Sequence, residues 1–436
     1  MSLRKQPGAN AASPAKAPQA KRLFPLILLG IGGAAAIAAG CERISFYSTG
    51  RATSEPSSSA SSSTSGSAGP TGGSTVVTRA VLLDAITTCN IELLDSFRDA
   101  AEELETAAAA AKDDPAAADK ARAAWTKAID IWQKAEVFQF GPAGPSTTPG
   151  GKALRDYIYS WPLVSRCLVE QNLVSKAYET PDFGTTALVN MRGLASAEYL
   201  LFHTGTDNAC SPATNINASG QWAALSPAEL AARKAHYSSV LASDVARAAR
   251  DLVKAWSPEG GNFKAQIANA GESGSVYTTE QMALNAVSDA MFYVESQVKD
   301  AKLARPLGLR LCDDATCPDA VESRFARRSR QHVRNNLLGV RMLIAGCNDG
   351  EGVGFDDLLT AVGASSLAGR MTADLDAAIA AADALKSDDI ASELGTDIVA
   401  VQNLHAAVKK VTDALKTEFV SVLDLELPTA LEGDND

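Results

Sequence analysis

The spacing of apolar residues is the strongest constraint on the fold, because these residues recur at helical intervals along most of the chain after residue 77. No segment shows a convincing strand-like alternation of apolar and polar residues. The same region is rich in Ala and Leu and poor in aromatic residues, which favours helix over sheet. We therefore predict an all-α protein. The expected helices span 76–111, 114–138, 163–178, 185–203, 226–256, 279–304, 318–346, 367–386 and 396–423.

Local signals mark where some of these helices begin and end. Asp114-Pro115 is typical of a helix start, and Ser226 with Glu229 forms a capping box. The segment FGPAGPSTTPGG, residues 140–151, breaks the helical pattern. Long helices separated by short breaks are typical of helical bundles. Their number suits two packed four-helix bundles, joined between Ser257 and Thr278.

The N-terminal region predicts export and membrane attachment. Leu23 to Gly40 is an apolar run of 18 residues that follows Lys21-Arg22 and ends in small residues before Cys41. We predict a signal peptide over 1–40, with Cys41 as the lipidated first residue of the mature chain. The alternative is an uncleaved anchor, because 18 residues are near the lower limit for spanning a bilayer. Both interpretations export the body and tether it.

Residues 41–77 are expected to form a linker between the lipid anchor and a folded domain over 78–430. The linker is rich in Ser, Gly and Thr and cannot bury enough apolar surface to fold. The predicted location is the cell envelope, with the body facing the periplasm or the cell surface. The formal net charge of −11 argues against nucleic acid as a partner, because phosphate contacts need clustered Lys and Arg.

Six cysteines follow Cys41, and an even number in an exported chain indicates disulfides. Cys312 and Cys317 are close enough in sequence to form a local loop. The other four allow three pairings, and the sequence does not choose among them. We favour Cys89–Cys167, because the Trp-Pro break before Cys167 could return it to the first helix.

Several carboxylates interrupt apolar helix stripes, where an unpaired buried charge would be costly. Glu198 lies within the segment RGLASAEYLLF, which begins at Arg192, and Glu136 shares a helix face with Trp125 and Trp132. A third face is mixed. It combines Glu322, Phe325, Ser329, His332 and Asn336 at helical spacing.

Two interpretations of these residues remain open. Each carboxylate could pair with a buried basic group, or the carboxylates could form a cluster inside a bundle that holds a hard cation. Under the second interpretation, Glu136 and Glu198 are the candidate metal ligands, and Arg192, Glu322 and His332 are candidate ligand-binding residues. HExxH, GxSxG and phosphate-loop motifs are absent from the sequence.

Taken together, several segments resemble the imelysin-like family, which is classified as a peptidase family. They are EVFQFGP (136–142), SWPL with the following Cys167, NMRGLASAEYLLF (190–202), Glu322-Ser323 with Ser329 and Asn336, and GFDDLL (354–359). The resemblance covers roughly residues 80–425. It implies an exported protein with two four-helix bundles related by a pseudo-twofold, here halves of about 78–257 and 258–430. Some family members are associated with iron uptake.

The family motif GxHxxE is incomplete in this chain. Gly193 and Glu198 match it, but Ala195 stands where the His belongs, and a methyl group can neither ligate a metal nor move a proton. We therefore expect a tethered binding protein without catalysis, linked to uptake of iron or another divalent cation, or to capture of a small ligand. Envelope transport proteins are further expected partners. The alternatives are a metallopeptidase of the family type and a structural or adhesion module.

Overall fold

The computed structural model describes residues 76–428 and Leu431, and within this part of the chain the regular structure is helical, with no strand. The predicted all-α class is confirmed. The signal peptide, Cys41 and nearly all of the linker lie outside the described residues. The α-helices are α1 (Arg79–Asp113), α2 (Ala118–Ala135), α3 (Leu154–Ile158), α4 (Arg166–Ser175), α5 (Phe183–Thr186), α6 (Gly193–Phe202), α7 (Asn215–Ala218), α8 (Pro227–Trp256), α9 (Phe263–Ala268), α10 (Glu280–Met291), α11 (Ser329–Ile344), α12 (Cys347–Gly350), α13 (Phe355–Ala361), α14 (Ser365–Asp383), α15 (Ile390–Thr396), α16 (Ile398–Ala414) and α17 (Val420–Leu423).

Shorter and wider helical segments complete the secondary structure. Two π-helices, η5 (Val294–Ala304) and η7 (Leu415–Phe419), continue from α10 and α16. The 3₁₀ segments are η1 (Pro115–Ala117), η2 (Gly141–Ala143), η3 (Ala177–Glu179), η4 (Val189–Met191) and η6 (Pro318–Ala320). No helix among residues 76–428 has both the length and the apolar character needed to cross a bilayer.

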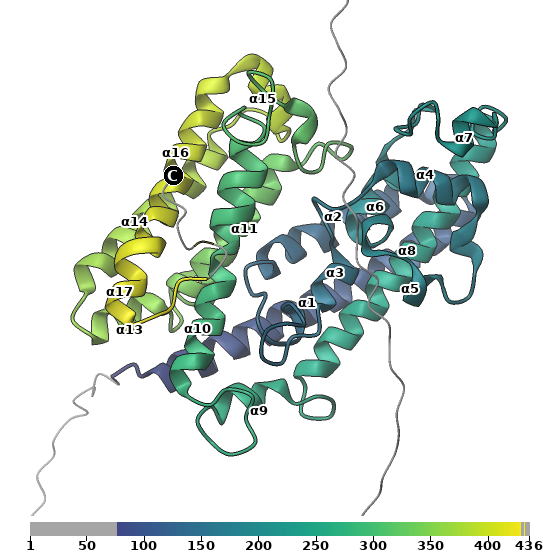
Figure 1. The fold of residues 1–436 in the computed structure, drawn as a ribbon. Helices are drawn as coiled ribbons and strands as arrows, with labels where there is room; N and C mark the ends of the chain where they lie inside the picture. The colour runs from purple at the N-terminus through teal and green to yellow at the C-terminus, as the bar shows by residue number, and fades with distance from the viewer. Residues whose placement is uncertain (1–75, 429–430, 432–436) are drawn as a thin grey trace, which may run out of the picture. The chain divides into compact units, whose positions relative to one another are not determined.

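The long helices pack in two groups (Figure 1). In the first, α1 packs against α2 and α8, and α8 also packs against α6. In the second, α14 packs against α11, α13 and α16, while η5 packs against α11 and α16. The α2–α11 pair joins the two groups and brings polar residues from both into one core. The predicted boundary near residue 257 stays a prediction.

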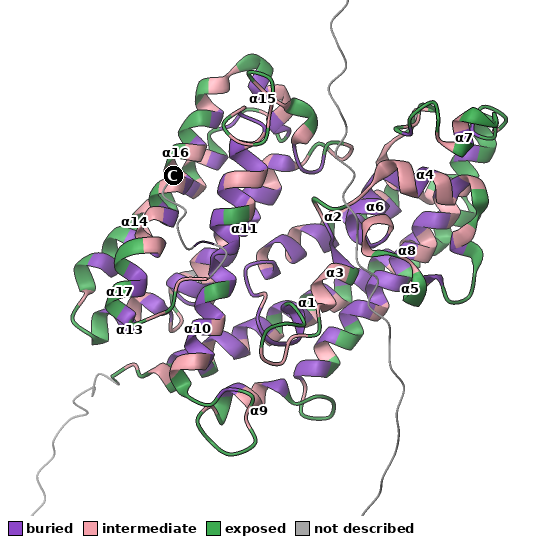
Figure 2. Ribbon diagram, viewed as in Figure 1, coloured by how far each residue is buried: buried purple, intermediate pink, exposed green. Residues whose placement is uncertain are grey.

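Two predicted helices are interrupted. The helix expected over 318–346 begins only at Ser329, because Ser323 and Arg327 adopt left-handed φ angles of 54° and 58° that no α-helix accepts. The helix expected over 185–203 begins at Gly193, and Leu188 is 62 % exposed instead of joining its apolar face. Every residue of α6 from Gly193 to Leu200 is buried, and the last two, Leu201 and Phe202, are half-buried (Figure 2).

Three disulfides occur among the described residues, and they correct one prediction. Cys312 pairs with Cys317, as expected. The expected Cys89–Cys167 pairing is wrong, because Cys89 bonds to Cys347 and Cys167 bonds to Cys210. The reason is the packing: α1 lies against α13, which follows Cys347, whereas α4 carries Cys167 next to the loop after α6. The Cys89–Cys347 bond links segments 258 residues apart.

Candidate functional site

A solvent-excluded polar core lies where α2, η5 and α11 meet, and Glu322 is at its centre. Its Oε1 accepts hydrogen bonds from Tyr159 Oη at 2.6 Å and from Gln133 Nε2 at 3.2 Å. Its Oε2 lies 3.0 Å from Lys302 Nζ and 3.2 Å from His332 Nδ1. The Glu322 side chain is therefore fixed by groups from four separate segments.

Lys302 is the cation of this core, and the π-helix η5 supplies it. Its Nζ donates to Gln133 Oε1 at 2.8 Å and to Asn336 Oδ1 at 2.7 Å, in addition to its ion pair with Glu322. The side chain is about 1 % exposed. Burying a charged group is costly unless it is paired and hydrogen-bonded, and these acceptors offset that cost.

Glu136 forms the second carboxylate of the core. Its Oε1 accepts from Arg155 Nε at 3.2 Å and from Trp132 Nε1 at 3.1 Å, and Oε2 accepts a hydrogen bond from Tyr293 Oη. Lys302 Nζ lies 4.0 Å from the same Oε2 and so links both carboxylates. The predicted burial of Glu136 beside a tryptophan is confirmed.

The electrostatics of the core favour an ionised Glu322 and neutral phenols. Burial alone would raise the pKa of Glu322, but the charge of Lys302 and the contact with His332 lower it to about 2. Burial raises the pKa of Tyr293 well above its usual range, and the neighbouring charge of Glu136 raises it further. Glu136 also raises the pKa of Arg155, although burial opposes this effect.

Glu198 supports a loop of the second helix group. Its Oε1 accepts hydrogen bonds from the backbone N–H groups of Phe325 and Ala326, both at 2.9 Å. Burial raises the pKa of Glu198, while these N–H groups and the nearby His332 act in the opposite direction. The carboxylate on the apolar stripe of α6 therefore holds the segment that presents Glu322 to the core.

Gly193, which begins α6, is required by the backbone. Its φ of +73° lies in the left-handed region, and a Cβ there would approach the carbonyl oxygen of Ile158 to 2.7 Å. Ala195 is buried in the same helix with 8 % exposure. The glycine of the motif thus has a conformational role that does not depend on the missing histidine.

The other predicted site residues divide into two groups. His332 contacts Glu322 through Nδ1, and its Nε2 has no hydrogen-bond partner among residues 76–428. Arg192 instead belongs to a separate buried ion pair, donating from Nε to Asp244 Oδ2 at 2.8 Å and stacking on the ring of Tyr157. Glu198 is close enough to the core to interact electrostatically with His332, which lowers its pKa, and with Glu322, which raises it.

The predicted metal ligands do not form a metal centre in the described part of the chain. No group of three or more His, Cys, Asp or Glu side chains is arranged there to hold a metal ion. Both oxygens of Glu136 and Oε1 of Glu322 accept hydrogen bonds, and Glu322 Oε2 lies 3.0 Å from Lys302 Nζ as an ion pair without a hydrogen bond. The residues present therefore fit a charge-paired core better than an ion site.

A cavity of about 1200 Å³ lies beside the core. Arg155 and Tyr293 line it and also hydrogen-bond to Glu136, so they connect the cavity with the core. Neither Glu136 nor Glu198 lines the cavity. Its other polar or aromatic lining residues include Gln139, Phe140, Trp161, Tyr277, Gln281, Asn285, Asp289, Phe292, Gln297 and Glu426.

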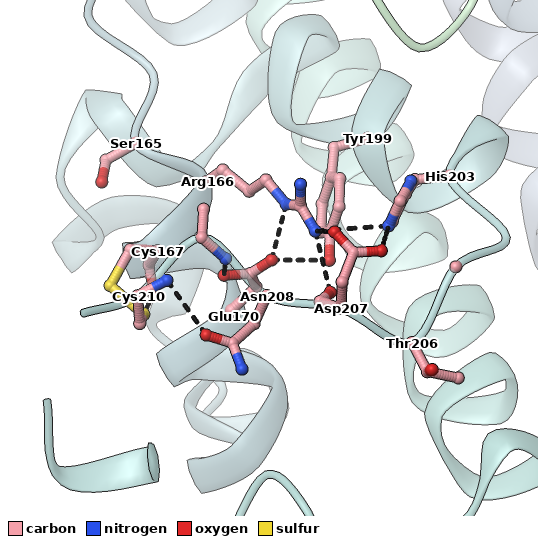
Figure 3. A network of polar contacts seen from close by, with 12 residues as sticks. Ser165, Arg166, Cys167, Glu170, Tyr199, His203, Thr206, Asp207, Asn208 and Cys210 are labelled. Atoms are coloured by element: carbon pink, nitrogen blue, oxygen red, sulfur yellow. Dashed lines mark hydrogen bonds and ion pairs between the residues drawn. A yellow bond between two sulfur atoms is a disulfide. The ribbon is translucent and has the colours of Figure 1, made fainter. Parts of the chain in front are cut away.

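A second polar network holds the loop that follows α6 (Figure 3). Arg166 lies between Glu170 and Asp207, with its Nε 2.6 Å from Glu170 Oε1 and its Nη2 2.7 Å from Asp207 Oδ2. Tyr199 and His203 complete the network, and the Cys167–Cys210 disulfide lies next to it. These groups satisfy one another, so we assign them a structural role.

The fold and site define an all-helical protein whose charge-paired core adjoins a large cavity. The sequence profile of the family described as imelysin (Peptidase_M75) matches residues 93–418. The chain therefore belongs to the imelysin family, and the resemblance inferred from its motifs is confirmed.

Individual proteins give a consistent picture. The chain is 25 % identical over 243 residues to "Iron-regulated protein A" of Synechococcus elongatus, a match that covers 55 % of this chain and 56 % of that protein. The chain thus spans about half the length of this curated relative. Two solved structures share the fold over 80 % of this chain and 96 % of theirs: an imelysin-like protein from Psychrobacter arcticum (TM-score 0.59, 16 % identity) and a putative iron-regulated protein A precursor from Parabacteroides distasonis (TM-score 0.60, 18 % identity).

Proposed function

We propose that the protein is an envelope-tethered, non-catalytic binding protein with an iron-related role. Two findings support the iron-related role: the chain belongs to the imelysin family, and one relative is named "Iron-regulated protein A". Tethering draws on the apolar run before Cys41 and on the linker that follows it. The N-terminal segment would attach the folded helical domain to a membrane.

The observation that carries the binding function is the cavity beside the polar core. Its volume of about 1200 Å³ is large enough for a medium-sized organic ligand or a metal chelate. The core carboxylates Glu136 and Glu322 are engaged by donors within the core and do not line the cavity, so neither faces it as a general base. Binding within the cavity, without bond breaking, is the function that this arrangement supports best.

Fluorescence offers a direct test, because Trp161 lines the cavity. The mature protein would be titrated with ferric complexes of different size and charge while tryptophan emission is followed. We expect saturable quenching that Trp161→Phe removes, since the other four tryptophans, Trp125, Trp132, Trp222 and Trp256, are buried. Absence of saturable binding for every ferric complex, checked by calorimetry, would contradict the proposal.

Two further measurements test the other parts of the proposal. Cys41→Ser should release the protein from the membrane fraction if the lipid anchor exists. Chelator-sensitive cleavage of a denatured protein substrate, lost in Glu198→Ala, would contradict the non-catalytic assignment and support the peptidase alternative. Iron analysis of protein purified from its native envelope would show whether the metal accompanies the protein in the cell.

A further inference from the structure

The loop between η5 and η6, residues 305–317, presents two leucines to solvent. Leu311 is 87 % exposed, which makes it the most exposed large apolar side chain in the described part of the chain, and Leu309 is 59 % exposed. Leu307, two residues earlier, is buried in the core. Single exposed leucines are common on protein surfaces, but here two neighbouring side chains of one loop point away from the core. We call Leu309 and Leu311 the apolar tip.

Covalent and backbone contacts hold this loop in one conformation. The disulfide between Cys312 and Cys317 closes it, and the backbone N–H of Cys317 donates to the carbonyl oxygen of Pro306 at 2.9 Å. Gly308 has a φ of +77°, and a Cβ there would lie 2.3 Å from the carbonyl oxygen of Ala315. The two sides of the loop are therefore in direct contact. A partner would meet a preformed surface, which lowers the entropic cost of association.

The backbone at Leu311 is strained without an internal compensation. Its φ of 45° lies in the left-handed region, which glycine and asparagine accept far more readily than leucine. The side chain is almost fully exposed, so packing within the chain does not offset this strain. A residue that is both strained and apolar on the surface destabilises the isolated protein. Such outliers cluster at sites that serve a contact or a reaction.

Acidic residues lie beside the apolar tip. Asp313 and Asp314 directly follow the first cysteine of the loop, and both are exposed. Arg310, between the two leucines, forms an ion pair with Asp300 of η5. The loop therefore presents apolar side chains next to carboxylates, which is a suitable surface for a pocket with basic groups at its edge.

The same charges argue against two other occupants. Segments that insert into membrane surfaces carry Lys and Arg, because these surfaces are anionic, whereas Asp313 and Asp314 would be repelled. A second copy of this chain is also a poor match, because its net charge of −11 opposes an acidic loop. A different protein with a basic surface has neither disadvantage.

We propose that the disulfide-closed loop is a docking site for a protein partner that has an apolar pocket for Leu309 and Leu311 and Lys or Arg side chains facing Asp313 and Asp314. Apolar anchors in a pocket commonly supply most of the binding energy, while charges at the edge select the partner. The inference goes beyond ligand binding and does not depend on it, because no residue of the loop lines the cavity.

Photo-crosslinking of the full chain in cells that naturally make it tests this docking. The photoreactive residue p-benzoylphenylalanine replaces Ala315, which is exposed in the loop and leaves both leucines intact. The matched control carries it at Val399, which is 58 % exposed on α16. We expect a covalent adduct with one protein at position 315 and none at position 399. Leu309→Ser and Leu311→Ser, each added to the position 315 variant, should remove the adduct.

Calorimetry with the partner, identified by mass spectrometry and purified, then measures the contributions of the loop. Leu309→Ser and Leu311→Ser should each weaken binding at least tenfold. The double variant Asp313→Asn, Asp314→Asn should weaken binding several-fold and reduce its dependence on salt. Val399→Ser should bind like the unchanged protein.

Leu311→Asn separates docking from a role in the fold. Asparagine accepts the left-handed backbone and removes the exposed apolar group, so the Tm of this variant should be at least that of the unchanged protein while binding is lost. A Tm lowered by several degrees would show that Leu311 stabilises its own chain, and would contradict the inference.

The other outcomes of the crosslinking also decide the question. No adduct at position 315, or an adduct that persists in both leucine variants, would overturn the docking site. Adducts with phospholipid would indicate insertion into a membrane, and an adduct of twice the chain mass would indicate a second copy. Either result would replace the proposed protein partner. None of these results bears on ligand binding in the cavity, so the two proposals fail separately.

Discussion

Lys302 Nζ lies 3.0 Å from Glu322 Oε2, and each of these side chains is at most about 1 % exposed. Lys302 comes from η5, and Glu322 from the loop before α11. Their ion pair therefore fixes the position of that loop against the π-helix. In such a dry environment, the loss of one partner costs more than the pair itself contributes.

Replacing Lys302 by Met should lower the free energy of unfolding by about 3–5 kcal/mol, because Glu322 and Glu136 would lose their shared cation. Chemical denaturation measures this change. Lys386→Met is the matched control, since the Lys386 side chain is 81 % exposed in its ion pair with Asp397 and should cost less than about 1 kcal/mol. Similar small losses for both variants would refute the assigned role of Lys302.

Stability should fall in acid as Glu322 takes up a proton. Its pKa of about 2 in the folded protein lies below the ordinary value of 4.5, so the stabilisation is complete above pH 4.5 and is lost as the pH falls toward 2. The effect is on the order of 3 kcal/mol. Glu322→Gln should flatten the dependence of unfolding free energy on pH in this window. Glu272→Gln, at an exposed position, should preserve it.

Glu198→Ala should release the loop that contains Phe325 and Ala326. The two backbone N–H groups would lose their acceptor, at a cost of about 2–4 kcal/mol. Glu198→Gln keeps a carbonyl oxygen and should cost less than half as much. Limited trypsin digestion provides a local readout, because Arg324 and Arg327 are exposed in the same loop. Unchanged cleavage at both arginines in Glu198→Ala would contradict this role.

The disulfides should differ in their contribution to stability. Replacing Cys89 and Cys347 by Ser frees a loop of 258 residues and should cost about 5–6 kcal/mol. The matched pair, Cys312 and Cys317, closes only five residues and should cost about 2 kcal/mol. Thermal unfolding without reductant compares the two double variants. A larger loss for the short loop would contradict the assignment.

The sequence identified the helical class and several core residues, but only part of the polar network. Glu136 and Glu198 interrupt apolar stripes, so their burial could be predicted from helical spacing. Glu322, His332 and Asn336 were also grouped correctly, although Glu322 precedes α11 and was expected within it. The left-handed backbone at Ser323 and Arg327 prevents an α-helix from forming before Ser329. Neither residue type indicates such a conformation in the sequence.

The partners of these carboxylates were missed for physical reasons. Lys302 lies in a π-helix, whose spacing differs from the α-helical period used to assign faces. Arg155 and Tyr159 follow the Gly-Pro break, where no periodic pattern predicts which side chains turn inward. Gln133 and Tyr293 lie in or next to helices, but only the folded chain brings them to Glu322 and Glu136.

The π-helix η5 also determines which insertions and deletions this protein can tolerate. An α-helix turns by about 100° per residue and the wider π-helix by somewhat less, so losing one residue between Glu295 and Lys299 would rotate Lys302 away from Glu322 by up to about that angle. The same deletion would keep Glu295 next to α16 while moving Lys299, its partner one turn later. The length of this segment is therefore as much a part of the site as the identity of its side chains.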